Sequence, residues 1–275
     1  MSIVLLCARH ELLIAIRSRS LQLFAVAFAT LALLVASAGY VMSGGYGLQD
    51  FARTAASLLQ LVLLVVPLTS VTFGALALTP DRGAAELLFA QPVSRARILY
   101  GRYLGLLVAL AAAQAVGFGL AGLVLNGQTG TAGMAGFIVV VAISLGLTAV
   151  FLAIAAMIAQ TSAERRARVL GLAVVIWFAA VVLYDVALLG AASLLRSGTA
   201  SRLLMTAAFA NPVDAARTVA LMAVEGTAAF GPASLALLRF TGGPTATAVI
   251  ASASLALWTI GPLVIAARRL TRADI

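Results

Sequence analysis

The sequence predicts an all-α integral membrane protein with six transmembrane helices and both termini in the cytoplasm. The first observation is composition: 63% of the 275 residues are apolar, 10% are charged and the mean hydropathy is +1.11, whereas soluble domains carry about 25% charged residues. The second is spacing, because uncharged intervals recur at the roughly 20 residues that a helix needs to cross a hydrocarbon core. The third is the distribution of arginines, which predicts the orientation.

Long uncharged intervals locate the spans. The first holds 22 residues, more than the roughly 7 to 15 of a signal peptide's apolar core, so we expect a retained anchor rather than a segment cleaved after 36–38. An interval of 61 residues is too long for one helix, and turn-forming residues at 126–133 divide it into two spans. No alternating strands of roughly ten residues are visible, so helices are favoured over a barrel. Within a single transmembrane domain, 1–275, the predicted spans are 21–42, 57–79, 103–125, 134–159, 169–194 and 245–267.

Arginine supplies all 18 basic residues, and it lies mainly in alternate connections. Thirteen arginines precede span one, separate spans two and three or four and five, or follow span six; five lie on the other side. The positive-inside rule therefore predicts cytoplasmic termini. The net charge of +9 does not indicate a nucleic-acid surface, because the arginines form small groups between apolar runs. The thirteen are Arg9, Arg17, Arg19, Arg82, Arg95, Arg97, Arg102, Arg165, Arg166, Arg168, Arg268, Arg269 and Arg272.

Small residues at four-residue spacing occur in and near span three. Gly101 and Gly105 form one row, and Ala111, Ala115 and Gly119 form another. Such rows allow helices to approach closely in lipid. The alternative is that alanine and glycine are simply abundant in this chain.

The stretch from Pro80 to Gly105 carries six charged residues inside an otherwise apolar chain. It begins with acidic residues, continues through an apolar centre at 87–89 and ends in a basic run. This pattern predicts a short helix, about 80–97, whose apolar face lies at the membrane surface or in a partner's groove. A loop that only sets topology is the alternative. The candidate contact residues are Asp81, Arg82, Glu86, Leu87, Leu88, Gln91, Pro92, Arg95 and Arg97.

Two segments resemble the ABC-2 type permeases, the membrane subunits of ATP-driven transporters. "PVSRARILYGRYLG", 92–105, resembles the cytoplasmic loop after that family's second span, and "ARHELLIAIRSRSLQLFA", 8–25, resembles its N-terminal amphipathic helix. The resemblance implies that 80–97 is a coupling helix seated on a separate ATPase subunit, which binds ATP and Mg, and that the permease pairs with a second copy of itself. The chain departs from the family at 81–84, usually acidic-Gly-Thr, and at Arg102, usually Lys.

Two further segments are similar to NosY-type permeases: "FANPVDAARTVALM", 209–222, and "VVLYDVALLG", 181–190. Those permeases work with the ATPase NosF and the periplasmic protein NosD in maturing the copper sites of nitrous oxide reductase. The resemblance implies NosF-like and NosD-like partners and a multi-pass location in a bacterial inner membrane. The chain has no lysine and hence no Gly-x-x-x-x-Gly-Lys-Ser/Thr motif, so we expect it not to hydrolyse ATP itself.

The segment 196–243 is the longest stretch on the predicted periplasmic side. Asn211 is a favourable N-cap, Pro212 suits the first helical position and Asp214 suits the first turn, so a helix is predicted from Asn211 to about Val224. Glycines and prolines interrupt the chain beyond this helix, and we expect short helices at or above the outer surface. This segment is the predicted dock for a periplasmic partner, and a lid over the bundle is the alternative. The candidate contact residues are Asn211, Pro212, Asp214 and Arg217.

Few side chains within the predicted spans could form ion pairs, relay protons or bind a metal. Asp185 lies in the outer part of span five, where a buried acid is costly, and we expect it to pair with an arginine; a proton relay is the alternative. Copper transport would need soft ligands, but the six methionines are dispersed, and Cys7 with His10 is at most a chance pair. We therefore predict no metal site and no cofactor in this chain, and hence a permease that transmits force rather than copper.

Other functions would leave different signals. An ABC-2 exporter of a drug, lipid or polysaccharide is the alternative within the same family. A secondary transporter should show paired repeats and helices broken at mid-membrane, for which Asp185 alone is slight support. An intramembrane enzyme would need a nucleophile with a base inside the spans, yet the one histidine, His10, lies outside them.

Overall fold

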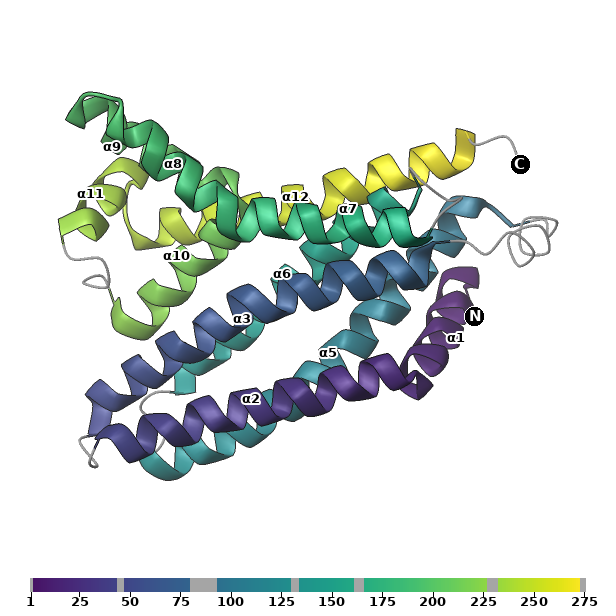
Figure 1. The fold of residues 1–275 in the computed structure, drawn as a ribbon, viewed down its shortest axis with the longest axis horizontal. Coiled ribbons are helices and arrows are strands. Elements are labelled where there is room, and N and C mark those ends of the chain that lie inside the picture. The colour runs from purple at the N-terminus through teal and green to yellow at the C-terminus, as the bar shows by residue number, and fades with distance from the viewer. Residues whose placement is uncertain are drawn as a thin grey trace.

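The computed structural model describes residues 2–43, 47–79, 93–129, 134–160, 166–226 and 232–272. In these ranges the regular structure is helical and no strand occurs. They contain six helical stretches long and apolar enough to cross a membrane, which confirms the predicted number of spans. Figure 1 shows that α1 and the end of α12 lie at one end of the molecule, whereas α9 and α11 lie at the other. The helices are α1 (Ile3–Arg17), α2 (Arg19–Ser43), α3 (Gly47–Leu78), α5 (Arg95–Thr129), α6 (Met134–Ala159), α7 (Arg166–Phe178), η2 (Ala179–Leu183), α8 (Tyr184–Ser193), α9 (Ser197–Ala210), α10 (Pro212–Glu225), α11 (Pro232–Thr241) and α12 (Pro244–Arg272).

The spanning helices extend past the uncharged intervals at most ends. α5 begins at Arg95 instead of 103, and α12 ends at Arg272 instead of 267. A helix continues as long as its backbone hydrogen bonds form, and a charged side chain near its end can reach the interface. The predicted coupling helix, about 80–97, is therefore wrong in its last residues, because Arg95 and Arg97 belong to the first turn of α5. The remainder of that prediction, 80–92, lies outside the described residues.

Span five is one continuous helix that changes from α-helical to π-helical geometry at its centre and back again. α7 passes into a π-helical segment, η2, of five residues, and α8 completes the span. Wider π turns insert an extra residue into a helix and occur often at functional sites. No proline or glycine lies in 179–183, so the sequence offered no sign of this irregularity.

The N-terminal helix α1 turns back from α2 at Ser18, whose backbone is extended at φ −72 and ψ 133. The Ser18 hydroxyl donates to the carbonyl oxygen of Ala15 at 2.7 Å and accepts from the Leu21 amide at 3.3 Å, so it stabilises both helix ends. This turn lays α1 against the start of α5. The other side of α1 is apolar and exposed, at Leu5, Leu6, Leu13, Ile14 and Ile16.

The buried core has two clusters. One unites α2, α3, α5, α6, α7 and α10, and within it Phe118 packs edge-on against Phe28 and Phe137, with ring centroids 5.2 and 6.0 Å apart. The second joins α1, α5 and the neighbouring ends of α2, α3, α6 and α12. Spans five and six are less enclosed: 6% and 17% of their most apolar windows are buried, against 61% for α6. Much of their surface is therefore left for lipid or another protein.

α10 contributes to this core. It begins after Asn211, as predicted, and ends at Glu225. It packs against α3, α6 and α12, and its buried residues include Val213, Ala216 and Ala220. α10 thus packs among three spans, at the end of the molecule where α9 and α11 also lie (Figure 1). The expectation that the helices of 196–243 lie at or above the outer surface stays a prediction.

Candidate functional site

Two glycines of α5 allow α1 to lie directly on its backbone. A Cβ at Gly101 would stand 2.5 Å from the Cys7 Cβ and 2.7 Å from the carbonyl oxygen of Val4. A Cβ at Gly105 would stand 2.8 Å from the Glu11 Cβ and would also meet the backbone of α1. The four-residue row predicted from sequence is thus a helix contact, and its partner is the N-terminal helix. At Gly119, by contrast, nothing lies within 4 Å of the corresponding position.

An ion pair also joins α1 to α5 at this contact. Nε of Arg102 donates to Oε2 of Glu11 at 2.9 Å, and Nη2 of Arg102 donates to the carbonyl oxygen of Ala77. Glu11 is buried, with 7% of its surface exposed, so this charge-assisted bond is shielded from water. Arg102 therefore joins α1, the end of α3 and the start of α5. We call Glu11, Ala77, Gly101, Arg102 and Gly105 the three-helix clamp.

The three-helix clamp borders the predicted coupling segment. α3 ends at Leu78 and α5 begins at Arg95, so the clamp contacts both helices that lead into 80–92. Of the predicted coupling residues, Arg95 donates from Nη1 to the carbonyl oxygen of Leu270 at 3.4 Å, and Arg97 is exposed. The other predicted residues, Asp81, Arg82, Glu86, Leu87, Leu88, Gln91 and Pro92, lie outside the described residues.

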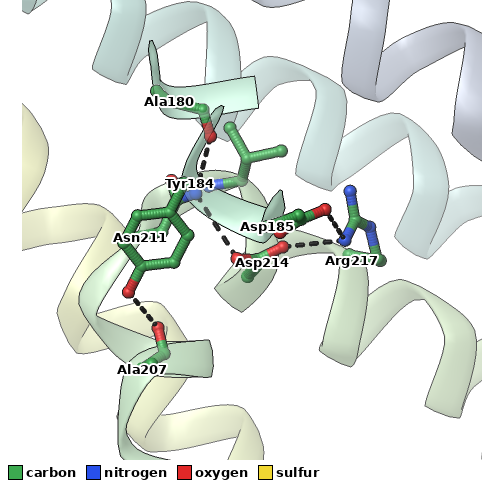
Figure 2. Close-up of polar contacts among 8 residues, drawn as sticks. Ala180, Tyr184, Asp185, Ala207, Asn211, Asp214 and Arg217 are labelled. Atoms are coloured by element: carbon green, nitrogen blue, oxygen red, sulfur yellow. Dashed lines mark hydrogen bonds and ion pairs between the residues drawn. The ribbon is translucent and has the colours of Figure 1, made fainter. Parts of the chain in front are cut away.

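A second polar group joins α8 to α10. Figure 2 shows the carboxylates of Asp185 and Asp214 on the same side of Arg217, whose Nη1 donates to Oδ2 of Asp185 at 3.0 Å and to Oδ1 of Asp214 at 2.9 Å. The predicted pairing of Asp185 with an arginine is confirmed. One guanidinium thus bridges an acid of span five and an acid of the first turn of α10. We call Asp185, Asn211, Asp214 and Arg217 the α8–α10 polar cluster.

Asn211 connects this cluster to the π-helical segment. Its Oδ1 accepts from the Val213 amide at 3.1 Å, which caps α10, while its Nδ2 donates to the carbonyl oxygen of Ala180 in η2 at 2.7 Å. Beside it, the hydroxyl of Tyr184 donates to the carbonyl oxygen of Ala207 at 2.8 Å (Figure 2). Hydrogen bonds from η2 and from the first residue of α8 therefore attach the middle of span five to α10 and α9, respectively.

Burial changes the protonation of Asp214. Loss of hydration raises the pKa of its carboxyl to about 6, the neighbouring Asp185 carboxylate also raises it, and Arg217 partly offsets both effects by lowering it. The two acids share one arginine, so a proton on Asp214 relieves their repulsion. The cluster can consequently change its charge near neutral pH.

The structure places the predicted periplasmic contact residues inside the protein. Asn211 and Asp214 are 4% and 8% exposed, Pro212 is buried, and Arg217 is half-buried over the two acids. In this arrangement their side chains contact other helices of the same chain. Their role as a dock stays a prediction. Exposed residues of this region lie on α9, such as Arg202 and Leu204, and on α11, such as Leu235 and Phe240.

The sequence did not predict Glu11 as the partner of Arg102, or Tyr184 as the donor to the Ala207 carbonyl oxygen. Glu11 is the sole acidic residue of α1, and a lone acid on an apolar helix is a signal that could have suggested a buried cation as its partner. Tyr184 precedes Asp185, but only the fold shows which backbone its hydroxyl reaches. No three His, Cys, Asp or Glu side chains gather as metal ligands among the residues the structure describes.

Comparison with known proteins agrees with these observations. A family model described as ABC-2 family transporter protein matches residues 5–275. A protein of Pseudomonas aeruginosa named probable ABC transporter permease protein NosY is 33% identical over 242 residues, covering 86% of this chain and 88% of the relative. A protein of Stutzerimonas stutzeri with the same name is 32% identical over 237 residues, covering 83% of this chain and 85% of the relative.

Proposed function

The chain belongs to the ABC-2 transporter family, and from that premise we propose that it is the NosY-like permease of an ATP-driven complex that helps assemble the copper sites of nitrous oxide reductase. Its partners in this proposal are a NosF-like ATPase that binds ATP and Mg, a NosD-like periplasmic protein and a second copy of itself. The names of the two relatives and the segments 181–190 and 209–222 support the assignment.

The three-helix clamp is the observation that carries the proposal. An ATPase docked on 80–97 would apply its force to the end of α3 and the start of α5, and Arg102 contacts both helices and α1. A buried charge-assisted contact resists separation better than an exposed one. The clamp would therefore make the three helices move as one body. This arrangement requires the clamp to lie on the cytoplasmic side, as the arginine distribution predicts.

The α8–α10 polar cluster would receive that movement at the far end. α3 runs from the clamp toward α10 and packs against it, and Arg217 ties α10 to span five. A displacement of α3 would thus reach α8 and, through the Tyr184 hydrogen bond, α9. The outer helices could in this way present a changed surface to a periplasmic protein. The permease would transmit force, and copper need not pass through it.

Charge reversal at Arg97 tests the proposal. Arg97 is exposed at the start of α5, so Arg97→Glu should leave the bundle intact while it opposes docking of the ATPase. In cells that express the complete complex, we expect normal amounts of permease in the membrane, at least about tenfold less co-purified ATPase, and reductase depleted of copper. Arg196→Glu, an exposed reversal at the start of α9, is the matched control and should retain the ATPase.

The outcomes separate the alternatives. Normal co-purification and normal reductase with Arg97→Glu would refute docking at this end of α5. Loss of the ATPase with fully copper-loaded reductase would refute the reductase role, and favour an exporter of a drug, lipid or polysaccharide. A transport activity that persists without any ATPase would instead indicate a secondary transporter.

A further inference from the structure

A basic pocket opens between the ends of α6 and α12. Its volume is about 410 Å³, and Gln160, Ile265, Arg268, Arg269 and Arg272 line it. The lining residues from α12 belong to the end of that helix, and Figure 1 shows this end of α12 at the same end of the molecule as α1. It is separate from both the three-helix clamp and the α8–α10 polar cluster.

The three arginines of this pocket have no anionic partner within the described part of the chain. Each is exposed, and none of the ion pairs or side-chain hydrogen bonds found there involves their guanidinium groups. Cations near a helix C-terminus interact favourably with the helix dipole, but this effect does not remove the mutual repulsion of three charges within five residues. An anion bound between the three arginines would offset this repulsion.

The chemistry of the lining favours a phosphate group. Guanidinium groups bind phosphate oxygens through two parallel hydrogen bonds, and the amide nitrogen of Gln160 offers a further donor. A pocket of about 410 Å³ is large enough for a polar headgroup, since small-molecule sites usually span about 300 to 1,000 Å³.

The surface below the pocket indicates that the phosphate belongs to a lipid. From Arg268, exposed apolar side chains continue along α12 through Ile265, which is 42% exposed, and Ile260 to Leu257, which is 71% exposed. Leu257 and Arg268 are 11 positions apart, which corresponds to a rise of about 16 Å along a helix. Half of a hydrocarbon core of about 30 Å is nearly the same depth. The arginines and apolar residues thus match the headgroup and the acyl chains of one leaflet.

We propose that this pocket binds the phosphate of an anionic phospholipid, with the acyl chains along α12. Basic pockets between transmembrane helices suit anionic headgroups because each arginine near such a surface strengthens binding by about fivefold. The bound lipid also lies near the ATPase-coupling region: the start of α5 contacts the end of α12 through the bond from Arg95 to the Leu270 carbonyl oxygen. Lipid occupancy therefore stabilises the end of α12 against α5 and α6.

The test uses the full chain in nanodiscs of phosphatidylcholine, titrated with phosphatidylglycerol. Binding is measured by native mass spectrometry and by the rise in the thermal unfolding midpoint. Replacement of Arg268, Arg269 and Arg272 by glutamine should weaken the binding of phosphatidylglycerol about a hundredfold. The control replaces Arg196, Arg202 and Arg239 by glutamine, which removes the same charge from exposed positions elsewhere and should leave the affinity unchanged.

A second arm distinguishes lipid from free anion. Inorganic phosphate and glycerol phosphate, which have no acyl chains, should neither raise the unfolding midpoint nor displace phosphatidylglycerol at millimolar concentration. Equal binding by these soluble anions would overturn the lipid assignment. Unchanged affinity in the triple variant, or equal loss in the control triple, would overturn the pocket itself. Circular dichroism at 222 nm, a band that reports helix content, verifies that each variant is folded.

Discussion

The contact between α1 and α5 can be tested with the substitution Gly101→Ala. The new Cβ would lie 2.7 Å from the Val4 carbonyl oxygen and 2.5 Å from the Cys7 Cβ. Ordinary carbon–oxygen contacts are about 3.3 Å or longer, so α1 must move away from α5 by roughly half an ångström or more. Because the obstacles are a backbone atom and a Cβ, no rotation of a side chain can relieve them.

Gly101→Ala has two effects on stability, of which one acts on the contact between α1 and α5. Overpacking of a close contact usually costs about 1 to 3 kcal/mol. Alanine also stabilises a helix by about 1 kcal/mol relative to glycine, but this gain belongs to α5 alone and does not hold α1 in place. We therefore expect the separation of α1 from α5 to become easier by the overpacking cost of about 1 to 3 kcal/mol, which corresponds to about a 5- to 160-fold larger population of the open state.

Cys7 supplies the assay without any engineering. It is the one cysteine of the chain, it is half-buried, and its Cβ faces Gly101. The rate of maleimide labelling in nanodiscs, with complete labelling in detergent-unfolded protein as the reference, should rise about 5- to 160-fold in Gly101→Ala. Gly119→Ala is the control on the same helix, because nothing lies within 4 Å of its Cβ, and it should label at the wild-type rate. Wild-type labelling in Gly101→Ala would refute the close contact.

Two further substitutions test polar groups. The side chain of Gln114 is fully buried, accepts a hydrogen bond from Ser144 at 2.6 Å and donates one to Thr148 at 2.7 Å. Gln114→Leu should therefore lower the free energy of unfolding by about 1 to 2 kcal/mol in an SDS titration. The control Thr30→Val removes a hydrogen bond within one exposed helix turn and should cost less. Because burial raises the folded-state pKa of Asp214 from 3.8 to about 6, wild-type stability should fall as pH rises through this interval. In Asp214→Asn that slope should vanish, and a thermal unfolding midpoint that keeps the same pH dependence would contradict the burial argument.

Local sequence signals were sufficient for much of the fold. The number and order of the spans depend on hydrocarbon thickness, and span 134–159 has the bounds of α6. The cap at Asn211 depends on side-chain hydrogen bonding within three residues. The helix ends predicted from the sequence were less accurate. A formal charge marks where a side chain prefers water and does not mark where the backbone hydrogen bonds of a helix stop.

The candidate sites depended on residues that are distant in the chain. Arg102 and Glu11 are 91 positions apart, and Arg217 and Asp185 are 32 apart, so the sequence offered each charge but not always its partner. Asp185 was expected to find an arginine because an acid in a span is costly alone. Glu11 was marked only as a lone acid on an apolar helix, without its partner, and nothing local marked the π-helical segment or the insertion of α10.

Sequence by itself determined that the chain crosses a membrane six times, because that depends only on the length and polarity of contiguous segments. Tertiary structure alone decided which helix fills the groove at Gly101 and Gly105, which acids share Arg217, and where three arginines converge beside Gln160. These pairings depend on the packing of helices from distant parts of the chain, and lipid offers little hydrophobic preference for one partner over another, so close packing and buried polar bonds select them.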